Sequence, residues 1–267
     1  MPPWGGIFVG MALPAAVQAL RVTMPLPAFP ATAPRMGLIG LGAFGAFCRP
    51  HLEKLGPVLG HDPAQPGGAS LAEAARQPVV ILAVPVARLA EVARAIAPHL
   101  RPGALVVEVC SIKTRPLALL REALPEHVEL LGTHPLFGPQ SGRDGIEGLR
   151  LVACPGGGAR ARLALRMLRR LGLQLVTMTP EEHDRQMAWV QGLTHLVARL
   201  VSGLEMPDLP HTTPSFELLM RATGQVSQDS EALFRTITED NPYVAEVKAQ
   251  LLARAEALLA SDVKLAA

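Results

Sequence analysis

Apolar residues in the first two thirds of the chain follow two alternating patterns. Short continuous apolar runs are typical of strands buried on both faces, and apolar residues at every third or fourth position are typical of amphipathic helices. The apolar runs lie at 36–40, 57–61, 78–84, 104–110, 128–131, 149–153 and 173–177. The helical patterns lie after residue 45 and at 86–100, 116–124 and 159–171. This alternation predicts an α/β fold in which a parallel sheet has helices on both faces.

The pattern changes at Thr179, where strands give way to helices. Thr179, Pro180 and Glu182 have the sequence of a helix N-cap, a first-turn proline and a capping box. Helical spacing then continues through 187–204 and returns at 216–223, 230–238 and 241–260. We therefore expect two domains, a sheet domain over 35–178 and a small all-α domain over 179–267. The second has much apolar surface and little core of its own, so we expect it to form a homodimer.

Residues 1–34 differ from the rest because they are apolar, rich in proline and without charge before Arg21. A signal peptide would have a basic start, and a membrane span needs roughly 20 uninterrupted apolar residues. We expect a disordered extension that neither targets nor anchors the chain. Three cysteines without a CxxC pair fit a reducing compartment, so a cytoplasmic location is predicted.

Composition narrows the classes of function. With 267 residues, of which 49% are hydrophobic, the chain can fill one large core or two modest ones. Lys plus Arg number 25 against 23 Asp plus Glu, and this near balance does not indicate a nucleic-acid partner. The histidines lack the HExxH spacing, and the pair His183-Asp184 is too short to indicate a metal-dependent hydrolase, so no metal is expected.

A glycine-rich turn follows the first predicted strand and leads into a helix. Gly40, Gly42 and Gly45 form a GxGxxG pattern, in which glycine permits a tight turn and close approach of a pyrophosphate to the helix N-terminus. Asp62 lies about 20 residues further on, where a carboxylate binds the adenosine ribose and repels a 2′-phosphate. NAD is therefore expected rather than NADP. The expected cofactor-binding residues are Gly40, Gly42, Phe44, Gly45, Asp62, Val84 and Pro85.

Polar residues after the later strands are expected to meet at the same edge of the sheet. Ser111 and Lys113 follow one strand and His134 follows the next, and ligands of open parallel sheets bind beyond the carboxyl ends of the strands. A histidine and a serine facing a nicotinamide indicate hydride transfer with a proton acceptor. A hydrolytic Ser/His pair is disfavoured because Ser111 lacks the GxSxG context. A purely structural Ser111 and a surface Lys113 remain alternatives.

Five segments together resemble the prephenate dehydrogenase family. They lie in that family's order and spacing at 40–45, 109–113, 132–139, 182–184 and 187–195. The resemblance implies a Rossmann domain followed by a helical dimerisation domain, and NAD-dependent oxidative decarboxylation of prephenate or arogenate in tyrosine biosynthesis. It implies that His134 accepts the proton of the ring hydroxyl and that Ser111 orients His134. His195 matches a helix histidine that either contacts substrate or is structural.

The chain departs from the family pattern at one substrate anchor. Relatives carry an arginine after a Ser/Thr-Pro-x-aromatic run, whereas this chain has Glu217 there and Arg221 one helical turn later. Three hypotheses remain: a prephenate dehydrogenase, the same chemistry on arogenate or 4-amino-4-deoxyprephenate, whose ammonium Glu217 could pair, or a non-catalytic NAD-binding protein. The expected substrate-binding residues are Ser111, Lys113, His134, His195, Glu217 and Arg221.

Overall fold

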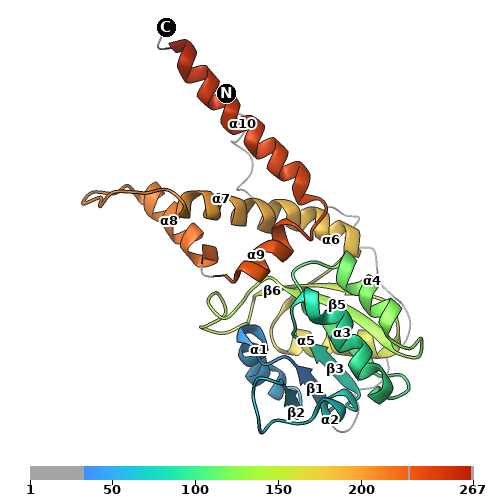
Figure 1. The fold of residues 1–267 in the computed structure, drawn as a ribbon. Helices are drawn as coiled ribbons and strands as arrows, with labels where there is room; N and C mark the ends of the chain where they lie inside the picture. Colours follow the sequence, from blue (N-terminus) through green and yellow to red (C-terminus); the bar gives the residue numbers. More distant parts are fainter. Residues whose placement is uncertain (1–32, 228, 266–267) are drawn as a thin grey trace.

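The computed structural model describes residues 33–227 and 229–265, so almost all of the expected N-terminal extension lies outside the described residues. The described chain builds one seven-stranded sheet with the order β2-β1-β3-β4-β5-β6-β7 (Figure 1). All neighbouring strands are parallel except β5 and β6. The strands are β1 (Met36–Ile39), β2 (Val58–His61), β3 (Val79–Leu82), β4 (Leu105–Glu108), β5 (Glu129–Pro135), β6 (Arg150–Pro155) and β7 (Gln174–Thr177).

The antiparallel pair β5–β6 corrects the expectation of a fully parallel sheet. Residues 136–149 join the two strands without a helix, whereas a parallel return usually needs a helical crossover. The chain therefore turns back on itself, and His134 pairs with Val152 in the register. This reversal leaves His134 next to the last residue of β5, at the edge where β1, β3 and β4 also end.

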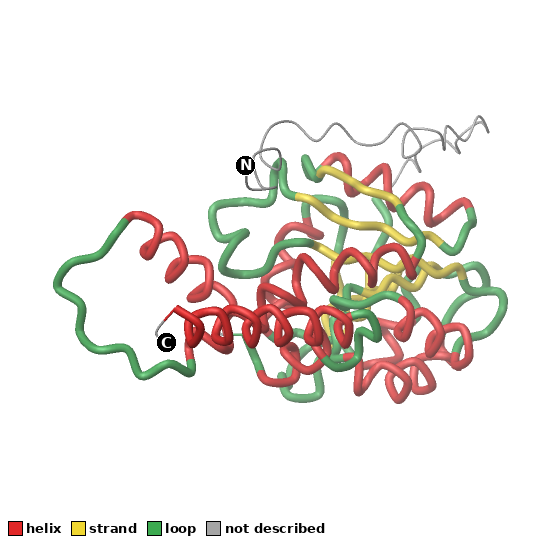
Figure 2. The backbone as a smooth tube through the Cα atoms, turned by 90° about the horizontal axis from the view of Figure 1, so that it is seen from above, coloured by secondary structure: helices red, strands yellow, loops and turns green. Residues whose placement is uncertain are grey.

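Helices cover both faces of the sheet, as the sequence pattern predicted (Figure 2). Alternate residues of one strand serve opposite faces: Leu82 packs in the core of one face and Ile81 in that of the other. The first face carries α2 (Leu71–Ala75), α3 (Val86–Ile96), the 3₁₀ turn η2 (Ala97–His99) and α4 (Thr114–Ala123). The second carries α1 (Ala43–Glu53) and α5 (Ala159–Arg170).

After β7 the described chain is helical. The predicted capping box is present, because the Thr179 hydroxyl accepts from the Glu182 amide and the Glu182 carboxylate accepts from the Thr179 amide. The long predicted helix is interrupted by one π-helical turn, a distortion that often occurs at functional sites. The elements are α6 (Pro180–Met187), η3 (Ala188–Gly192), α7 (Leu193–Ser202), α8 (Pro214–Ser227), α9 (Glu231–Thr238) and α10 (Val244–Leu265).

The helix α10 starts in the body of the molecule and then extends away from it (Figure 1). Val244 and Val247 at its start are buried against Ala188 of η3. Further along, Leu252 and Leu259 are exposed. Across the described ranges, no helix combines the length and the apolarity that crossing a membrane requires.

Candidate functional site

The glycine turn between β1 and α1 has a different steric requirement at each glycine. Gly40 has a φ of +95°, and a Cβ there would lie 2.4 Å from the Ala83 carbonyl oxygen. A Cβ on Gly45 would lie 1.9 Å from the Gly40 carbonyl oxygen, so α1 packs directly on the end of β1. A Cβ on Gly42 would meet nothing within 4 Å. The turn is therefore tight on its inner side and open at Gly42, where α1 begins without a side-chain cap and its first amides can face an anion.

Asp62 follows β2 and its carboxylate is fixed by the backbone. One oxygen accepts from the Leu41 amide at 2.7 Å and the other accepts from the Ala64 amide at 2.9 Å. These two hydrogen bonds, that from Leu41 first, lower the pKa of Asp62 below its ordinary value. The ionised carboxylate retains lone pairs for further donors such as ribose hydroxyls.

The other expected cofactor residues lie around the same turn. The Val84 side chain lies 3.0 Å from where a Cβ of Gly40 would be, and Pro85 is the N-cap residue of α3. Phe44 lies in the first turn of α1 and contacts Phe47, with ring centroids 6.0 Å apart. The structure thus brings the ends of β1, β2 and β3 together at the glycine turn, where Leu41 contacts Asp62 and Gly40 contacts Ala83 and Val84.

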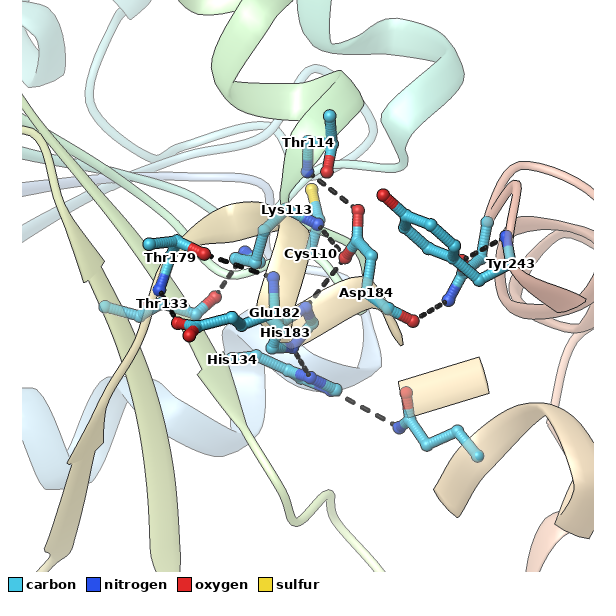
Figure 3. A network of polar contacts seen from close by, with 12 residues as sticks. Cys110, Lys113, Thr114, Thr133, His134, Thr179, Glu182, His183, Asp184 and Tyr243 are labelled. Atoms are coloured by element: carbon cyan, nitrogen blue, oxygen red, sulfur yellow. Dashed lines mark hydrogen bonds and ion pairs between the residues drawn. The ribbon is translucent and has the colours of Figure 1, made fainter. Parts of the chain in front are cut away.

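His134 lies at the carboxyl end of β5 inside a chain of hydrogen-bonded side chains (Figure 3). Its side chain is only 3% exposed. Its Nδ1 lies 2.8 Å from Nε2 of His183, and Nδ1 of His183 lies 2.7 Å from Oδ1 of Asp184. Its Nε2 lies 3.3 Å from the amide nitrogen of Gln191, which belongs to the π-helical turn η3. Side chains from α6 and η3 therefore contact both nitrogens of the His134 ring.

Asp184 is held by groups at the start of α4 and in the turn before α10. Oδ1 accepts from the Lys113 amide at 2.7 Å and Oδ2 accepts from the Thr114 amide at 2.9 Å, at the start of α4. Its backbone carbonyl accepts from Nδ2 of Asn241 at 2.8 Å, just before α10. Burial alone would raise the pKa of Asp184, but the hydrogen bonds from His183, Thr114 and Lys113 outweigh it, so the pKa lies below its ordinary value.

Lys113 is fully buried rather than a surface lysine. Its ammonium forms an ion pair with the equally buried Glu108 and donates to the Thr133 carbonyl at 2.6 Å. The second Glu108 oxygen accepts from the Cys110 amide at 2.9 Å. The ammonium expected to contact a substrate is thus enclosed by these partners, because a buried charge must be paired, and it links the ends of β4 and β5 beside His134.

Both histidines of the network are held neutral. Burial lowers the pKa of His134 well below its ordinary value, and the positive charges that His183 and Lys113 can carry lower it further. Burial also lowers the pKa of His183, although its hydrogen bond to Asp184 acts in the opposite direction. At neutral pH, His134 therefore has a lone pair available to accept a proton.

Ser111 and His195 lie near this network without a direct hydrogen bond to His134. Ser111 is partly buried in the bend after β4, and among the described residues the hydrogen-bond partners of His134 are His183 and Gln191 rather than Ser111. His195 is buried, with Nδ1 2.9 Å from the backbone carbonyl oxygen of Gln191 and Nε2 3.1 Å from the Asp229 carboxylate. It thus contacts the same residue, Gln191, that contacts His134.

The two expected anchors on α8 are exposed. The Glu217 carboxylate accepts from the Thr212 hydroxyl at 2.7 Å. Arg221 lies one turn further along the same helix. In the described part of the chain, no hydrogen bond or ion pair joins either side chain to His134, His183 or Asp184.

An apolar cavity of about 1010 Å³ lies between α1 and α5, on the face of β5 opposite to His134. Thr133 and Pro135 line it, whereas His134 does not, as expected for alternate residues of a strand. The network of His134, His183, Asp184 and Gln191 therefore lies outside this cavity.

Sequence reasoning missed Glu108, His183, Asp184 and Gln191 as parts of this site. The segment Glu182-His183-Asp184 is part of the family resemblance, but its sequence alone excludes a metal-dependent hydrolase without assigning a role to His183 or Asp184. A useful signal was available, because a charged Glu108 inside an otherwise apolar strand needs a buried partner.

Comparisons with known proteins agree with this architecture. Residues 63–151 match the family described as "Prephenate dehydrogenase, nucleotide-binding domain", and residues 179–260 match "Prephenate dehydrogenase, dimerization domain". The chain belongs to the prephenate dehydrogenase family. The family resemblance, the α/β sheet and the helical second part expected from the sequence are thereby confirmed, and the chain is assigned to a family of oxidoreductases.

Curated relatives of this prephenate dehydrogenase family member have different named substrates. A probable arogenate/prephenate dehydrogenase of Methanocaldococcus jannaschii is 30% identical over 183 residues, 63% of this chain and 40% of that protein. Arogenate dehydrogenase 1, chloroplastic, of Arabidopsis thaliana is 29% identical over 79% of this chain and 36% of its own length. A 4-amino-4-deoxyprephenate dehydrogenase of Streptomyces pristinaespiralis is 34% identical over 57% of this chain and 50% of its own length. The chain thus spans half or less of the length of these relatives.

Solved structures share the fold. Prephenate dehydrogenase from A. aeolicus, crystallised with hydroxyphenyl propionate and NAD+, has a TM-score of 0.68 at 20% identity and covers 89% of this chain and 94% of its own. Synechocystis arogenate dehydrogenase has a TM-score of 0.61 at 20% identity, covering 85% and 92%. At such identities, the likeness shows the fold alone.

Proposed function

We propose that the chain is an NAD-dependent dehydrogenase that oxidatively decarboxylates prephenate to 4-hydroxyphenylpyruvate, with His134 as the proton acceptor. The observation that carries the proposal is the buried, neutral His134 at the same sheet edge as the glycine turn. A neutral histidine there can take the proton of the ring hydroxyl while hydride leaves the ring carbon. The family assignment supports this reaction class.

The glycine turn and Asp62 fit a dinucleotide. The open side of Gly42 and the uncapped start of α1 would receive the pyrophosphate, and the Asp62 carboxylate would accept from the ribose hydroxyls. The negative charge of Asp62 would repel a 2′-phosphate, which favours NAD over NADP. Bound NAD+ would supply the hydride acceptor. Phe44, Val84 and Pro85 would border the bound cofactor.

The chain's own residues then need only orient, deprotonate and exclude water. Removing the proton from the ring hydroxyl pushes hydride off the same carbon, and the ring carboxylate leaves as carbon dioxide. Aromatisation supplies the driving force, so positioning dominates the catalytic task. Ser111 lies at the same strand edge as His134 and remains our candidate for a substrate contact.

Gln191 occupies the position in which the reacting hydroxyl must bind. Its side-chain nitrogen Nε2 lies 3.3 Å from Nε2 of His134, while its side-chain oxygen Oε1 is buried without a hydrogen-bond partner among the described residues. We infer that the Gln191 side chain moves aside or rotates when substrate binds. Its carbonyl oxygen would then accept from a substrate donor, and the π-helical turn provides a locally irregular backbone for this change.

A comparison of three substrates, prephenate, arogenate and 4-amino-4-deoxyprephenate, tests the proposal directly. We expect the chain to form NADH and carbon dioxide from prephenate, and the rates with all three substrates are measured in parallel. If Glu217 lies in the substrate pocket, Glu217→Arg should raise kcat/KM for prephenate about tenfold or more, because a bidentate arginine replaces a repelling carboxylate. The exposed Glu126→Arg, with the same charge change, should have no effect.

Other outcomes of this comparison lead to the alternatives. Faster turnover of the two amino substrates, reversed by Glu217→Arg, would show that Glu217 selects an ammonium group. Tight binding of NAD+ with no turnover of any of the three substrates would indicate a non-catalytic nucleotide-binding protein and contradict the proposal.

We further propose that the segment 179–267 forms a homodimer. The family description of this part as a dimerization domain supports the proposal, and so do the exposed leucines of α10, which recur seven residues apart at Leu252 and Leu259. Such spacing places both on one face of the helix. A projecting helix with an apolar face is stable in water when a second copy covers that face.

The double variant Leu252→Glu/Leu259→Glu is expected to convert the dimer to a monomer at micromolar concentration. Light scattering coupled to size-exclusion chromatography gives the mass. The variant Ala253→Glu/Ala257→Glu adds the same charge on another face of α10 and should remain dimeric. An unchanged mass for the leucine variant would rule out this face as the interface.

A further inference from the structure

We infer that Asp184 and His183 are positioning residues that fix the tautomer and ring orientation of His134, so that its Nε2 presents a lone pair to the reacting hydroxyl. The inference rests on the proposed role of His134 as proton acceptor. It adds a hydrogen-bonded chain that runs from α4 through α6 to β5 (Figure 3).

The direction of each hydrogen bond follows from its fixed end. The carboxylate of Asp184 only accepts, because it is ionised and already receives two backbone amides. Nδ1 of His183 must therefore carry the hydrogen that it shares with Asp184. A neutral imidazole carries one N–H, so Nε2 of His183 is an acceptor.

The contact between His183 and His134 fixes the tautomer of His134 in turn. Because Nε2 of His183 accepts, Nδ1 of His134 must donate across the 2.8 Å contact. His134 is neutral, so its own Nε2 then has no hydrogen. The amide nitrogen of Gln191, a donor, lies 3.3 Å from that atom, which agrees with a lone pair there. This one arrangement pairs a donor with an acceptor at each of the three contacts that join Asp184, His183, His134 and Gln191.

The opposite tautomer of His134 is disfavoured by burial. With hydrogen on Nε2, Nδ1 of His134 would need a donor from His183, while His183 must still donate to Asp184. His183 would then be an imidazolium with no exposed surface. Burial disfavours that charged form, as the lowered pKa of His183 indicates. The chain therefore selects the tautomer that a proton acceptor needs.

The same contacts prevent the rings from turning. His183 is fully buried and Asp184 is 1% exposed, and Asn241 holds the Asp184 backbone. When His134 takes the substrate proton at Nε2, the new charge is stabilised through the His183 hydrogen bond and the nearby Asp184 carboxylate. No proton has to move along the chain, because the transferred proton stays on Nε2 of His134.

The tautomer can be measured independently of turnover. In the full-length chain labelled with ¹⁵N-histidine, we expect the His134 signals, assigned by their absence in His134→Asn, to show hydrogen on Nδ1 and none on Nε2. In Asp184→Asn we expect a shift toward the Nε2-protonated form and a fall in kcat of about 10²-fold or more. The equivalent substitution in the serine protease triad acts through the wrong tautomer. KM for NAD+ should not change.

Two variants at His183 test the same inference if Asp184→Asn does not fold. His183→Gln offers a side-chain carbonyl oxygen that can accept from Nδ1 of His134, whereas His183→Leu offers no acceptor. The glutamine variant should therefore retain the native tautomer of His134 and have a higher kcat than the leucine variant. Arg115→Gln is the control. It removes the exposed ion pair with Asp240, next in sequence to Thr114 and Asn241 that hold Asp184, and should leave the tautomer of His134 unchanged.

Two results would overturn the inference. One is a native His134 with hydrogen on Nε2, and the other is an unchanged tautomer and kcat in both Asp184→Asn and His183→Leu. If none of the cyclohexadienyl substrates is turned over, the proposed reaction fails, but the NMR measurement still decides whether Asp184 and His183 fix the tautomer.

Discussion

His134→Asn is expected to lower kcat by about 10³-fold, the usual contribution of a positioned proton acceptor, with little change in the affinity for NAD+. Asparagine can donate to Nε2 of His183 from its amide and so keep that contact, but it cannot take a proton. Turnover is measured by NADH absorbance and NAD+ affinity by calorimetry.

The matched control is His127→Asn, which makes the same change at an exposed loop position. It should retain native activity. The rate at low pH gives a second measurement: because the pKa of His134 is held well below 6.5, kcat/KM should not fall until the pH is well below that value. A His134→Asn variant with more than a tenth of native kcat would exclude His134 as the proton acceptor.

Lys113→Met is expected to lower the free energy of unfolding by about 3–5 kcal/mol, the usual effect of removing one partner of a buried ion pair. Methionine fills much of the volume of the lysine stem, so the loss comes mainly from Glu108, which would remain buried without its cation. Burial already raises the pKa of Glu108, and Lys113 is the main opposing influence. Urea unfolding measures the change.

The double variant Lys113→Met/Glu108→Gln separates charge from packing. It removes both charges and should recover more than half of the lost stability, since neutral replacements of buried pairs are often well tolerated. If Lys113→Met alone is as stable as the native chain, the ion pair is not important for the fold.

The sequence pattern was sufficient to predict most elements, because strands buried on both faces and amphipathic helices leave clear periodicities. It failed at β5–β6, where direction depends on whether the connection at 136–149 contains a helix. It also missed α2, whose five residues are too few for a period to be visible. The capping box at Thr179 was predictable because it is local.

The candidate site was predicted in part, for a related reason. His134 could be found because strand ends of a parallel sheet meet at one edge. Its partner His183 could not, because the contact depends on how α6 packs beside β5 and α4. The ion pair of Lys113 and Glu108 depends likewise on a strand end folding back on its own strand, which residue spacing alone does not show.

The position of Asn241 has a consequence for the order of synthesis. The sheet, with His134 in place, is complete at Thr177, but Asn241 holds the Asp184 backbone from a point much later in the chain. On the proposed mechanism, a nascent chain would acquire its nucleotide-binding turn first and its oriented base only after α10 has begun to dock. Partly synthesised chains could then bind NAD+ without oxidising a substrate, and catalysis would begin only when the last helices have folded onto the sheet.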